Sequence, residues 1–416
     1  MATVLVSFIG KGSFDKEGKR NYRKANYKFA QDEGHDEALF KNSSLFGVSL
    51  LKRLQACKRG VDRWLVMGTQ ISTWDALLEC VESDKDNELE NIYLQIGEAV
   101  EQSNATQSLL DKWQTELNNF ATTKIICRLV GTADGFESQE KIWQALAETI
   151  KDGDKIVLDV TNGLRHQPVI ASFMVMLLRW LRDVKKVDLY YRAFELTAKE
   201  NDEDVCPVIR LPLCNELLEA TEAVSMLKQT GNFSPLGKWF NLSANNLEKV
   251  VFTDEINHPE KGFATKLRGE LKSQSHNSFQ TTLSPLLDEA LDWASETSLA
   301  HIYKRKAQFA FEHEQYFQSI AFLWEAVMVA GCQKYSISQP MSFDSREAAR
   351  KQLKSKINEQ DKEVLQKIEY LRNAIMHGTE LEPSRVKSSI ESALKDSVVF
   401  NKIYNEGTSL LNSLLQ

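Results

Sequence analysis

The chain has 416 residues, of which 42% are hydrophobic and 26% are charged, and its formal net charge is −7. This composition is typical of a globular protein with two or three domains, and the net charge excludes a whole-molecule attraction to nucleic acid. None of the six cysteines forms a C-x-x-C pair, no apolar run reaches the roughly 18 residues of a membrane helix, and the first residues lack the features of a signal peptide. We therefore expect a cytoplasmic protein with reduced thiols and without a metal or cofactor.

The first half of the chain alternates between strand-like and helix-like segments. Short apolar runs that end in glycine or polar residues predict strands at 3–10, 62–69, 124–131, 154–163, 187–196 and 207–213. Helical patterns lie between several of them, at 44–58, 87–119, 139–150 and 166–182. Apolar strands that alternate with helices predict an α/β domain whose parallel sheet is covered on both faces. The long helix at 87–119 has no role that the sequence reveals.

The segments that follow four of these strands share a composition. They read SFIGKG at 7–12, GTQIS at 68–72, GTADG at 131–135 and TNGLRH at 161–166. Each offers small residues, hydroxyl groups and backbone N–H donors. In open α/β sheets ligands bind outside the carboxyl ends of the strands, so we expect a ligand site there.

The stretch LDVTNGLRHQP, residues 158–168, passes from a buried strand through a turn into a helix. Pro168 suits the first helical turn, and a helix N-terminus presents N–H donors to an anion. Arg165 adds a planar cation that suits phosphate, and His166 can hydrogen-bond a base or a phosphate. The residues alone leave a ligand site and a purely structural turn equally open.

From about residue 215 the strand-like runs give way to helical periodicity. Helices or helix pairs are predicted at 215–238, 265–299, 301–335, 345–378 and 383–416, and 240–263 is predicted to be a loop-rich connector. Within the apolar helix at 317–335, Glu325 lies beside Trp324. A carboxylate there is costly unless it is paired, so it either pairs with Arg372 or points to solvent.

The stretch YLRNAIMHG, residues 370–378, places polar residues within an apolar helix. At about 100° per residue, Asn373 and His377 share a helix face and Arg372 lies at its edge. Taken in isolation, the pattern favours a solvated helix end with a C-terminal cation and Gly378 as the cap.

Residues 159–168 resemble the ligand motif of CARF domains, the CRISPR-associated Rossmann-fold sensors of cyclic oligoadenylates. Residues 4–10 and 66–69 are similar to that family's first two strands and loops, and the resemblance covers about the first 213 residues. It implies a homodimer that binds the ring across its two-fold axis. By position, the floor of the ligand site would be lined by Ser7, Phe8, Gly10 and Lys11. Gly68 and Thr69 would flank this floor. The phosphates and riboses of the ligand would be held by Thr161, Asn162, Gly163, Arg165 and His166.

The hexapeptide from Arg372 to His377 resembles the R-N-x-x-x-H motif of HEPN ribonucleases. That family implies an all-helical domain that dimerises with the motif at the interface. His377 would transfer a proton, Arg372 would stabilise the charged transition state, and Asn373 would orient the histidine or bind a phosphate oxygen. Attack by the ribose 2′-OH would need no metal and would leave a 2′,3′-cyclic phosphate.

Together the two motifs resemble the ancillary ribonucleases of type III CRISPR antiviral defence. The expected order is a Rossmann-like sensor at 1–214, a helical connector at 215–299 and a helical nuclease domain at 300–416. Expected partners are single-stranded RNA, a second copy of the chain and a cyclic oligoadenylate of four rather than six units. The link to the type III effector complex would be functional, without stable association. Two alternatives remain open: a ligand-binding regulator without nuclease activity, and a ring nuclease that uses Thr161, Arg165 and His166 on its own activator.

Overall fold

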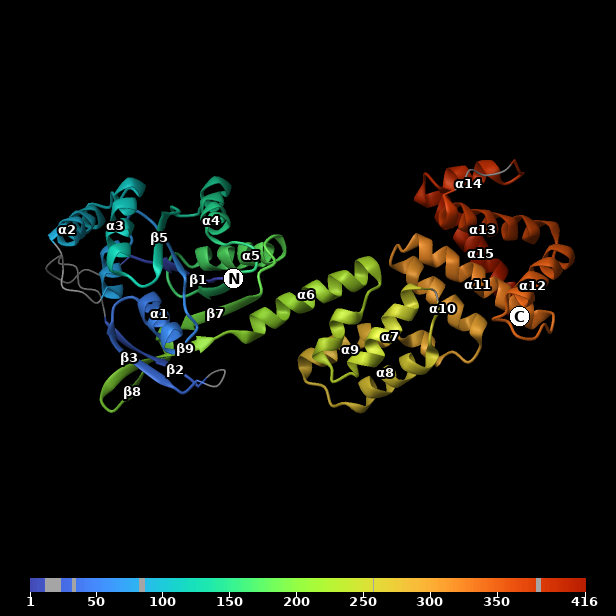
Figure 1. Cartoon of the computed structure of the whole chain (residues 1–416), viewed down its shortest axis with the longest axis horizontal. Helices are drawn as coiled ribbons and strands as arrows, with labels where there is room; N and C mark the ends of the chain where they lie inside the picture. Colours follow the sequence, from blue (N-terminus) through green and yellow to red (C-terminus); the bar gives the residue numbers. More distant parts are fainter. Residues whose placement is uncertain (12–23, 32–34, 82–86, 257, 379–382) are drawn as a thin grey trace. The chain divides into compact units, whose positions relative to one another are not determined.

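The computed structural model describes residues 1–11, 24–31, 35–81, 87–256, 258–378 and 383–416. The chain divides into two compact units, Met1–Leu218 and Glu219–Gln416 (Figure 1). The first unit is α/β and the second is helical, as the sequence predicts. Within the described ranges, no helix combines the length and apolar character needed to cross a membrane.

One mixed sheet organises the first unit. Its described strands are β1 (Thr3–Ile9), β2 (Ala25–Phe29), β3 (Ala38–Ser43), β4 (Arg63–Gly68), β5 (Lys124–Leu129), β6 (Lys155–Asp159), β7 (Lys186–Arg192), β8 (Ala198–Glu200) and β9 (Glu203–Arg210). They follow the order β3-β2-β9-β7-β6-β1-β4-β5, with β8 paired to β9. The five strands from β5 to β7 are parallel, and the chain order reverses beside β1. This reversal makes the edge between β1 and β6 a topological switch point, where Rossmann-type sheets bind ligands.

The prediction of a parallel sheet is correct for these five strands and incomplete beyond them. β9 is antiparallel to β7, and β3 is antiparallel to β2. β2, β3 and β8 were not predicted from the sequence. β8 is exposed throughout, three of the six residues of β3 are exposed, and neither strand has the long apolar run on which a strand prediction depends.

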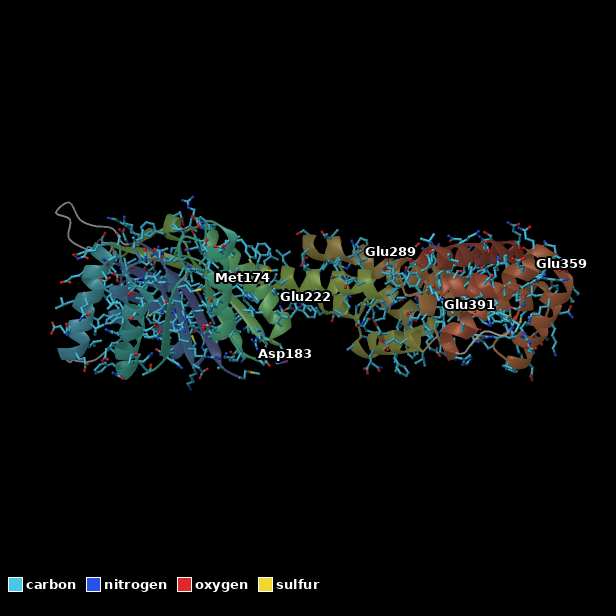
Figure 2. The ribbon with its side chains drawn as sticks, turned by 90° about the horizontal axis from the view of Figure 1, so that it is seen from above. Met174, Asp183, Glu222, Glu289, Glu359 and Glu391 are labelled. Carbon is cyan, nitrogen blue, oxygen red and sulfur yellow. The ribbon has the colours of Figure 1, made fainter. Side chains whose placement is uncertain are left out.

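Both faces of the sheet are covered, because alternate side chains of each strand enter different hydrophobic clusters. Leu5 packs under α1 (Phe46–Ala56), the 3-10 helix η1 (Trp74–Cys80), α2 (Asn87–Glu101) and α3 (Gln107–Phe120). Val4 and Val6 pack under α4 (Phe136–Thr149) and α5 (His166–Leu181). Figure 2 labels Met174 on α5, which is partly buried against this second cluster.

The single helix predicted at 87–119 is wrong, because two helices occupy this segment. α2 ends at Glu101, and Ser103 has a φ of +57°, which an α-helix does not allow. Thr106 then caps α3 by accepting a hydrogen bond from the Leu109 N–H at 3.3 Å. Apolar residues continue on both sides of the break, so the periodicity did not reveal it.

The second unit consists of helices. They are the continuation of α6 (Pro212–Thr230), η3 (Ser234–Trp239), α7 (Ala244–Glu255), α8 (Lys261–Ser273), α9 (Ser278–Ala290), η4 (Asp292–Ser295), α10 (Leu299–Glu312), α11 (Tyr316–Lys334), α12 (Phe343–Lys356), α13 (Glu359–His377), α14 (Lys387–Ala393) and α15 (Ser397–Leu415). The loop-rich connector predicted at 240–263 is wrong, because α7 fills much of it behind a Ser243 cap. Two hydrophobic clusters form, one from α6 to η4 and one from α10 to α15.

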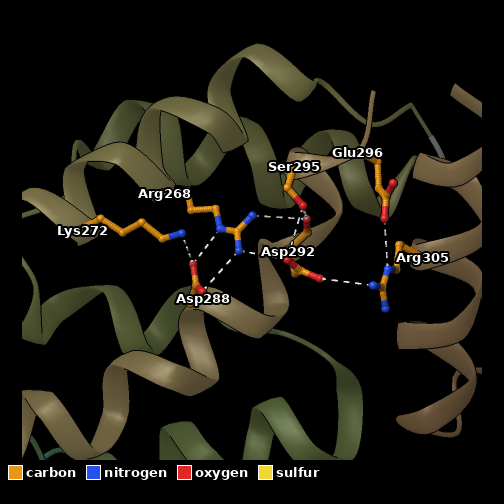
Figure 3. Close-up of polar contacts among 7 residues, drawn as sticks. All are labelled: Arg268, Lys272, Asp288, Asp292, Ser295, Glu296 and Arg305. Carbon is orange, nitrogen blue, oxygen red and sulfur yellow. Dashed lines mark hydrogen bonds and ion pairs between the residues drawn. The ribbon is translucent and has the colours of Figure 1, made fainter. Parts of the chain in front are cut away.

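An ion-pair network joins the elements of these two clusters (Figure 3). Arg268 of α8 donates from Nε to Asp288 at 2.6 Å and from Nη2 to Asp292 of η4 at 2.9 Å. Arg305 of α10 donates to Glu296 at 3.2 Å and lies 3.8 Å from Asp292. The connector segment is therefore fastened to α10 through polar contacts as well as through packing.

Candidate functional site

The loop after β1 rests on two side chains that point into the core. Ser7 is 2% exposed, and its Oγ accepts a hydrogen bond from the Trp64 indole at 2.7 Å. Phe8 is fully buried in the cluster under α4 and α5. In this structure neither side chain is exposed to a ligand, so two of the four residues predicted to line the floor of the ligand site instead support the loop from the core. Gly10 and the exposed Lys11 continue the chain beyond the strand.

The loop after β4 is tied to the loop after β1. Ser72 Oγ donates to the carbonyl of Ile9 at 2.7 Å and accepts from the Thr69 N–H at 2.9 Å. The Thr73 N–H donates to the Gly10 carbonyl at 3.0 Å. A Cβ at Gly68 would lie 2.6 Å from the Ile9 side chain, so only glycine fits there. The predicted residues Gly68 and Thr69 thus lie beside Gly10.

The loop after β6 meets the same edge. A Cβ on Gly10 would lie 3.6 Å from the Gly163 nitrogen, which places these two loops in contact. Gly163 has a φ of +89°, and a Cβ there would come within 2.8 Å of both Phe8 and Gln167. A side chain at this position would therefore break the turn for conformational and steric reasons. The loops of β1, β4 and β6 converge at the switch point.

The first turn of α5 is fastened to the loop after β5. Gln167, 1% exposed, accepts from the Leu164 N–H at 2.9 Å and donates to the Gly131 carbonyl at 2.8 Å. His166 is exposed and its Nε2 lies 2.7 Å from the Thr132 carbonyl. Since a carbonyl only accepts, Nε2 carries the proton and Nδ1 faces away from this bond. Arg165 is exposed next to it.

A buried carboxylate lies under Thr161. The Thr161 N–H donates to Asp159 Oδ1 at 2.8 Å, and the Thr161 hydroxyl oxygen accepts from the Arg192 N–H at 2.9 Å. Asp159 is 0% exposed, its Oδ2 has no hydrogen-bond partner in the described part of the chain, and burial raises its pKa to about 6. The Arg192 guanidinium donates to the Tyr27 hydroxyl at 3.1 Å. Thr161 is thus held from both sides, and Asn162 is left partly exposed at the turn.

The second motif ends α13. His377 is the last helical residue and is exposed, and Gly378 caps the helix with a φ of +61° and an N–H bond of 2.9 Å to Ala374. Arg372 donates from Nη1 to Asn373 Oδ1 at 2.9 Å. Its Nε is buried and has no hydrogen-bond partner among the described residues. The motif therefore combines an oriented cation with a histidine that is open to solvent.

Glu325 does not pair with Arg372. It forms an ion pair with Arg346 of α12 instead, so that prediction was wrong. α12 packs against α11 at this position, which supplies a closer cation than α13 does. Another buried carboxylate, Glu369 of α13, pairs with Arg350 and with Lys354 at 2.8 Å. These pairs fix α12 against its neighbours.

Residues 4–195 match the family model described as the CARF domain of the CRISPR system endoribonuclease Csx1. Over this range the chain forms a CARF domain. It is 26% identical over 315 residues to CRISPR-associated protein MJ1674 of Methanocaldococcus jannaschii, a match that covers 70% of this chain and 45% of that relative. The chain thus spans less than half the length of the curated relative. A structure of Enterococcus italicus Csm6 bound to cyclic hexa-2′-fluoro-hexa-dAMP aligns with a TM-score of 0.40 at 12% identity, over 100% of this chain and 94% of that one.

Several residues that shape the CARF loops were not predicted from the sequence. Ser72 ties the first two loops, Gln167 fixes the start of α5, and Asp159 with Arg192 brackets Thr161. Ser72 and Asp159 stood next to predicted site residues in the quoted motifs. No local pattern points to Arg192, because β7 reaches Thr161 only through the sheet.

The buried Asp159 makes the stability of this CARF domain depend on pH. Its pKa is raised in the folded state, so the folded protein binds this proton more strongly than the unfolded chain does, and stability is lost as pH rises from about 4 through about 6. The difference between a pKa of about 4 and one of about 6 corresponds to about 3 kcal/mol of stability. We expect Asp159→Asn, which keeps the bond from Thr161, to raise the free energy of unfolding at pH 8 by up to this amount and to change it little at pH 4.

Denaturant unfolding at both pH values measures the difference. Asp111→Asn, which changes an exposed carboxylate on α3, is the matched control and should follow the wild type. If the Asp159→Asn protein lost stability with pH as steeply as the wild type does, another group would be responsible.

Proposed function

We propose that the protein is a homodimeric endoribonuclease of type III CRISPR defence that a cyclic oligoadenylate activates to cleave single-stranded RNA. Residues 1–214 sense the ligand, 215–299 connect and 300–416 cleave. The observation that carries the proposal is the convergence of the β1, β4 and β6 loops at the switch point of a CARF sheet. The same chain carries the Arg372–His377 motif at an exposed helix end.

The converging loops have the chemistry of an anion cradle. The first turn of α5 offers backbone N–H groups and the positive end of a helix dipole. Lys11 and Arg165 are exposed beside it and add two cations per protomer. Asn162 and the Gly163 backbone allow close approach by phosphates and riboses, while the buried Ser7 and Phe8 hold the loop shape. We propose a ring of four adenylates, and titration calorimetry with rings of four and six units tests that choice.

A dimer is supported by the outer face of α5. Exposed apolar side chains recur along it at helical spacing, at Val169 (56%), Phe173 (66%), Leu177 (51%) and Trp180 (61%). The opposite face buries Ala171, Val175 and Leu178 against the sheet. A continuous apolar stripe on a water-facing helix marks an interaction surface. The same stripe on a second protomer would make a self-complementary interface beside the cradle. The cradles of the two protomers would then bind one cyclic oligoadenylate together.

The α13 motif supplies the groups needed for RNA cleavage. His377 accepts the proton of the ribose 2′-OH as its oxygen attacks the adjacent phosphorus, the bond to the 5′ oxygen breaks, and a histidine protonates that oxygen. Arg372 stabilises the charge on the transition state, and Asn373 orients Arg372 through the 2.9 Å bond. One copy provides a single histidine, so two copies brought together provide an acid and a base. The products are a 2′,3′-cyclic phosphate and a 5′ hydroxyl.

The proposal predicts that ligand and nuclease activity are coupled. Purified protein is expected to cleave single-stranded RNA only when cyclic oligoadenylate is added, because the ring favours one dimer geometry over another. Gel analysis of a labelled RNA with and without cyclic tetra- and hexa-adenylate measures this. Linear oligoadenylate of the same length is the control. Protein that binds the ring and leaves every RNA intact would instead be a regulator without nuclease activity.

A second candidate function rests on the exposed His166 beside Arg165. Together with Thr161, these groups can stabilise attack within the ring itself, which would make the CARF domain a ring nuclease. Chromatography of the ring after long incubation with His377→Ala protein separates ring turnover from RNA cleavage.

A further inference from the structure

A cavity of about 310 Å³ lies within the second unit, between the end of α6, α7 and the α10–α11 hairpin. The residues that line it include none of the predicted site residues. Its volume lies at the lower end of the range of small-molecule pockets, about 300–1,000 Å³. Its chemistry therefore has to be judged from the side chains around it.

A buried ion pair is part of the lining of the cavity. Lys306 of α10 is 6% exposed, and its Nζ lies 2.6 Å from Oδ1 of Asp254 in α7. The ammonium also lies 4.4 Å from the centre of the Trp293 ring. Asp254 cancels the lysine charge, and Glu255 adds a negative charge to the lining. The cavity therefore disfavours a phosphate and accepts an uncharged ligand.

Two amides and an aromatic ring form the walls. Gln315 and Gln318 are partly buried, and neither side-chain amide has a hydrogen-bond partner among the described residues. A Cβ on Gly231 would lie 3.0 Å from the Gln315 amide nitrogen, so glycine gives this amide its room. The partly exposed Phe309 adds a ring to the wall. Glutamine amides match the donor and acceptor edges of nucleobases, and aromatic side chains stack on unpaired bases.

The positions of α11, α12 and α13 along one another show where the cavity lies relative to the Arg372–His377 motif. Lys356 lies over the Tyr335 ring at 4.9 Å, which places the end of α12 beside the end of α11. α13 begins three residues later and so runs back along α11 in the opposite direction. A Cβ on Gly407 would touch both Leu323 of α11 and Ile368 of α13, which fixes the level at which the two helices meet.

From that level, His377 lies nine residues further along α13 and Gln315 lies eight residues back along α11. At 1.5 Å per residue these distances are about 13 Å and about 12 Å along the helix axes. Because the helices are antiparallel, both residues lie at the same end of the bundle. The cavity and the motif are therefore at the same axial level of the helical unit.

From this arrangement we infer that the cavity binds an unpaired base of the RNA substrate and so positions the strand for cleavage. Gln315 and Gln318 bond the base edge, and Phe309 packs on its face. The inference rests on the proposed ribonuclease function and adds a substrate-positioning subsite to it. It also predicts base preference in a nuclease that otherwise contacts only the sugar–phosphate chain.

The test measures RNA affinity by fluorescence anisotropy in His377→Ala protein activated with cyclic oligoadenylate. Adding Gln315→Leu and Gln318→Leu removes the amides while keeping similar volume, and should weaken binding of a single-stranded oligoribonucleotide about tenfold. Gln352→Leu, which changes an exposed glutamine on α12, is the control and should bind like the parent. An oligomer of abasic sites should bind all three proteins equally. Thermal melting checks that each variant folds, and Gln318→Glu, which keeps the shape, should change the preference among A, C and U oligomers.

Each outcome decides the question. Unchanged RNA affinity in the double variant overturns the inference. Binding of free adenosine that the double variant loses, with RNA affinity intact, makes the cavity a nucleoside site and also overturns it. If neither the parent nor the wild-type protein binds or cleaves RNA, the proposed function fails first, and that result is distinct from loss of the cavity alone.

Discussion

His377→Ala is expected to lower the rate of ligand-activated RNA cleavage by about 10²–10⁴-fold, the usual contribution of a general acid or base. The side chain is exposed at the end of α13, so its removal leaves no cavity in the core. Ligand binding should be unaffected, because the CARF loops belong to the other unit. Single-turnover cleavage of a labelled RNA, with calorimetry of ring binding on the same sample, measures both quantities.

The control is His258→Ala, which removes a histidine that is 60% exposed in the connector and should cleave like the wild type. Arg372→Lys adds a further comparison, since it keeps the charge and loses the planar fork that bonds Asn373. Full activity in the His377→Ala protein would show that the catalytic histidine has been misassigned.

Phe173→Asp is expected to weaken dimerisation by about two orders of magnitude or more, because the proposed dimer would then bury two carboxylates in place of two aromatic side chains. Phe173 is 66% exposed on α5, so the protomer itself should fold normally. If one cyclic oligoadenylate must contact the loops of two protomers, the monomeric Phe173→Asp protein should also bind cyclic oligoadenylate more weakly and lose ligand-dependent cleavage. Sedimentation velocity, calorimetry and the cleavage assay measure these three effects.

Phe252→Asp is the matched control, since Phe252 is 58% exposed but belongs to α7 of the other unit. It should leave dimerisation and activity unchanged. A wild-type protein that is monomeric with and without the ring, or a Phe173→Asp protein that stays dimeric, would rule out the α5 face as the interface.

The local sequence pattern was sufficient to predict a strand where the strand is apolar and is bounded by small or polar residues. β1, β4, β5 and β6 were predicted within a few residues, since each is a buried run that ends near Gly10, Gly68, Gly131 or Thr161. β2 was missed because it has only five residues and pairs with the distant β9, and β3 was missed because three of its six residues are exposed. The break between α2 and α3 was missed although residues 101–108 are almost all polar, because apolar residues recur at helical spacing on both sides of that segment.

The residues of the candidate sites also divide into those that the sequence predicts and those that it does not. Thr161, Gly163 and Arg165, like Arg372 and His377, stand in short motifs whose residues are neighbours in sequence. Some of the residues that contact these site residues lie far from them in the sequence. Arg192 reaches Thr161 across the sheet, and Arg346 rather than Arg372 pairs with Glu325 across the helical unit.

The sequence by itself determined an α/β half followed by a helical half, which strand ends carry the ligand loops, and where the Arg372–His377 motif lies. Those features depend on side-chain periodicity and on contacts between residues a few positions apart. Only the tertiary structure decided which side chains face the core, as for Ser7 and Phe8, and which distant groups meet, as for Lys306 and Asp254. Burial and long-range pairing are properties of the packed chain, since a residue's neighbours in space are chosen by all the elements together.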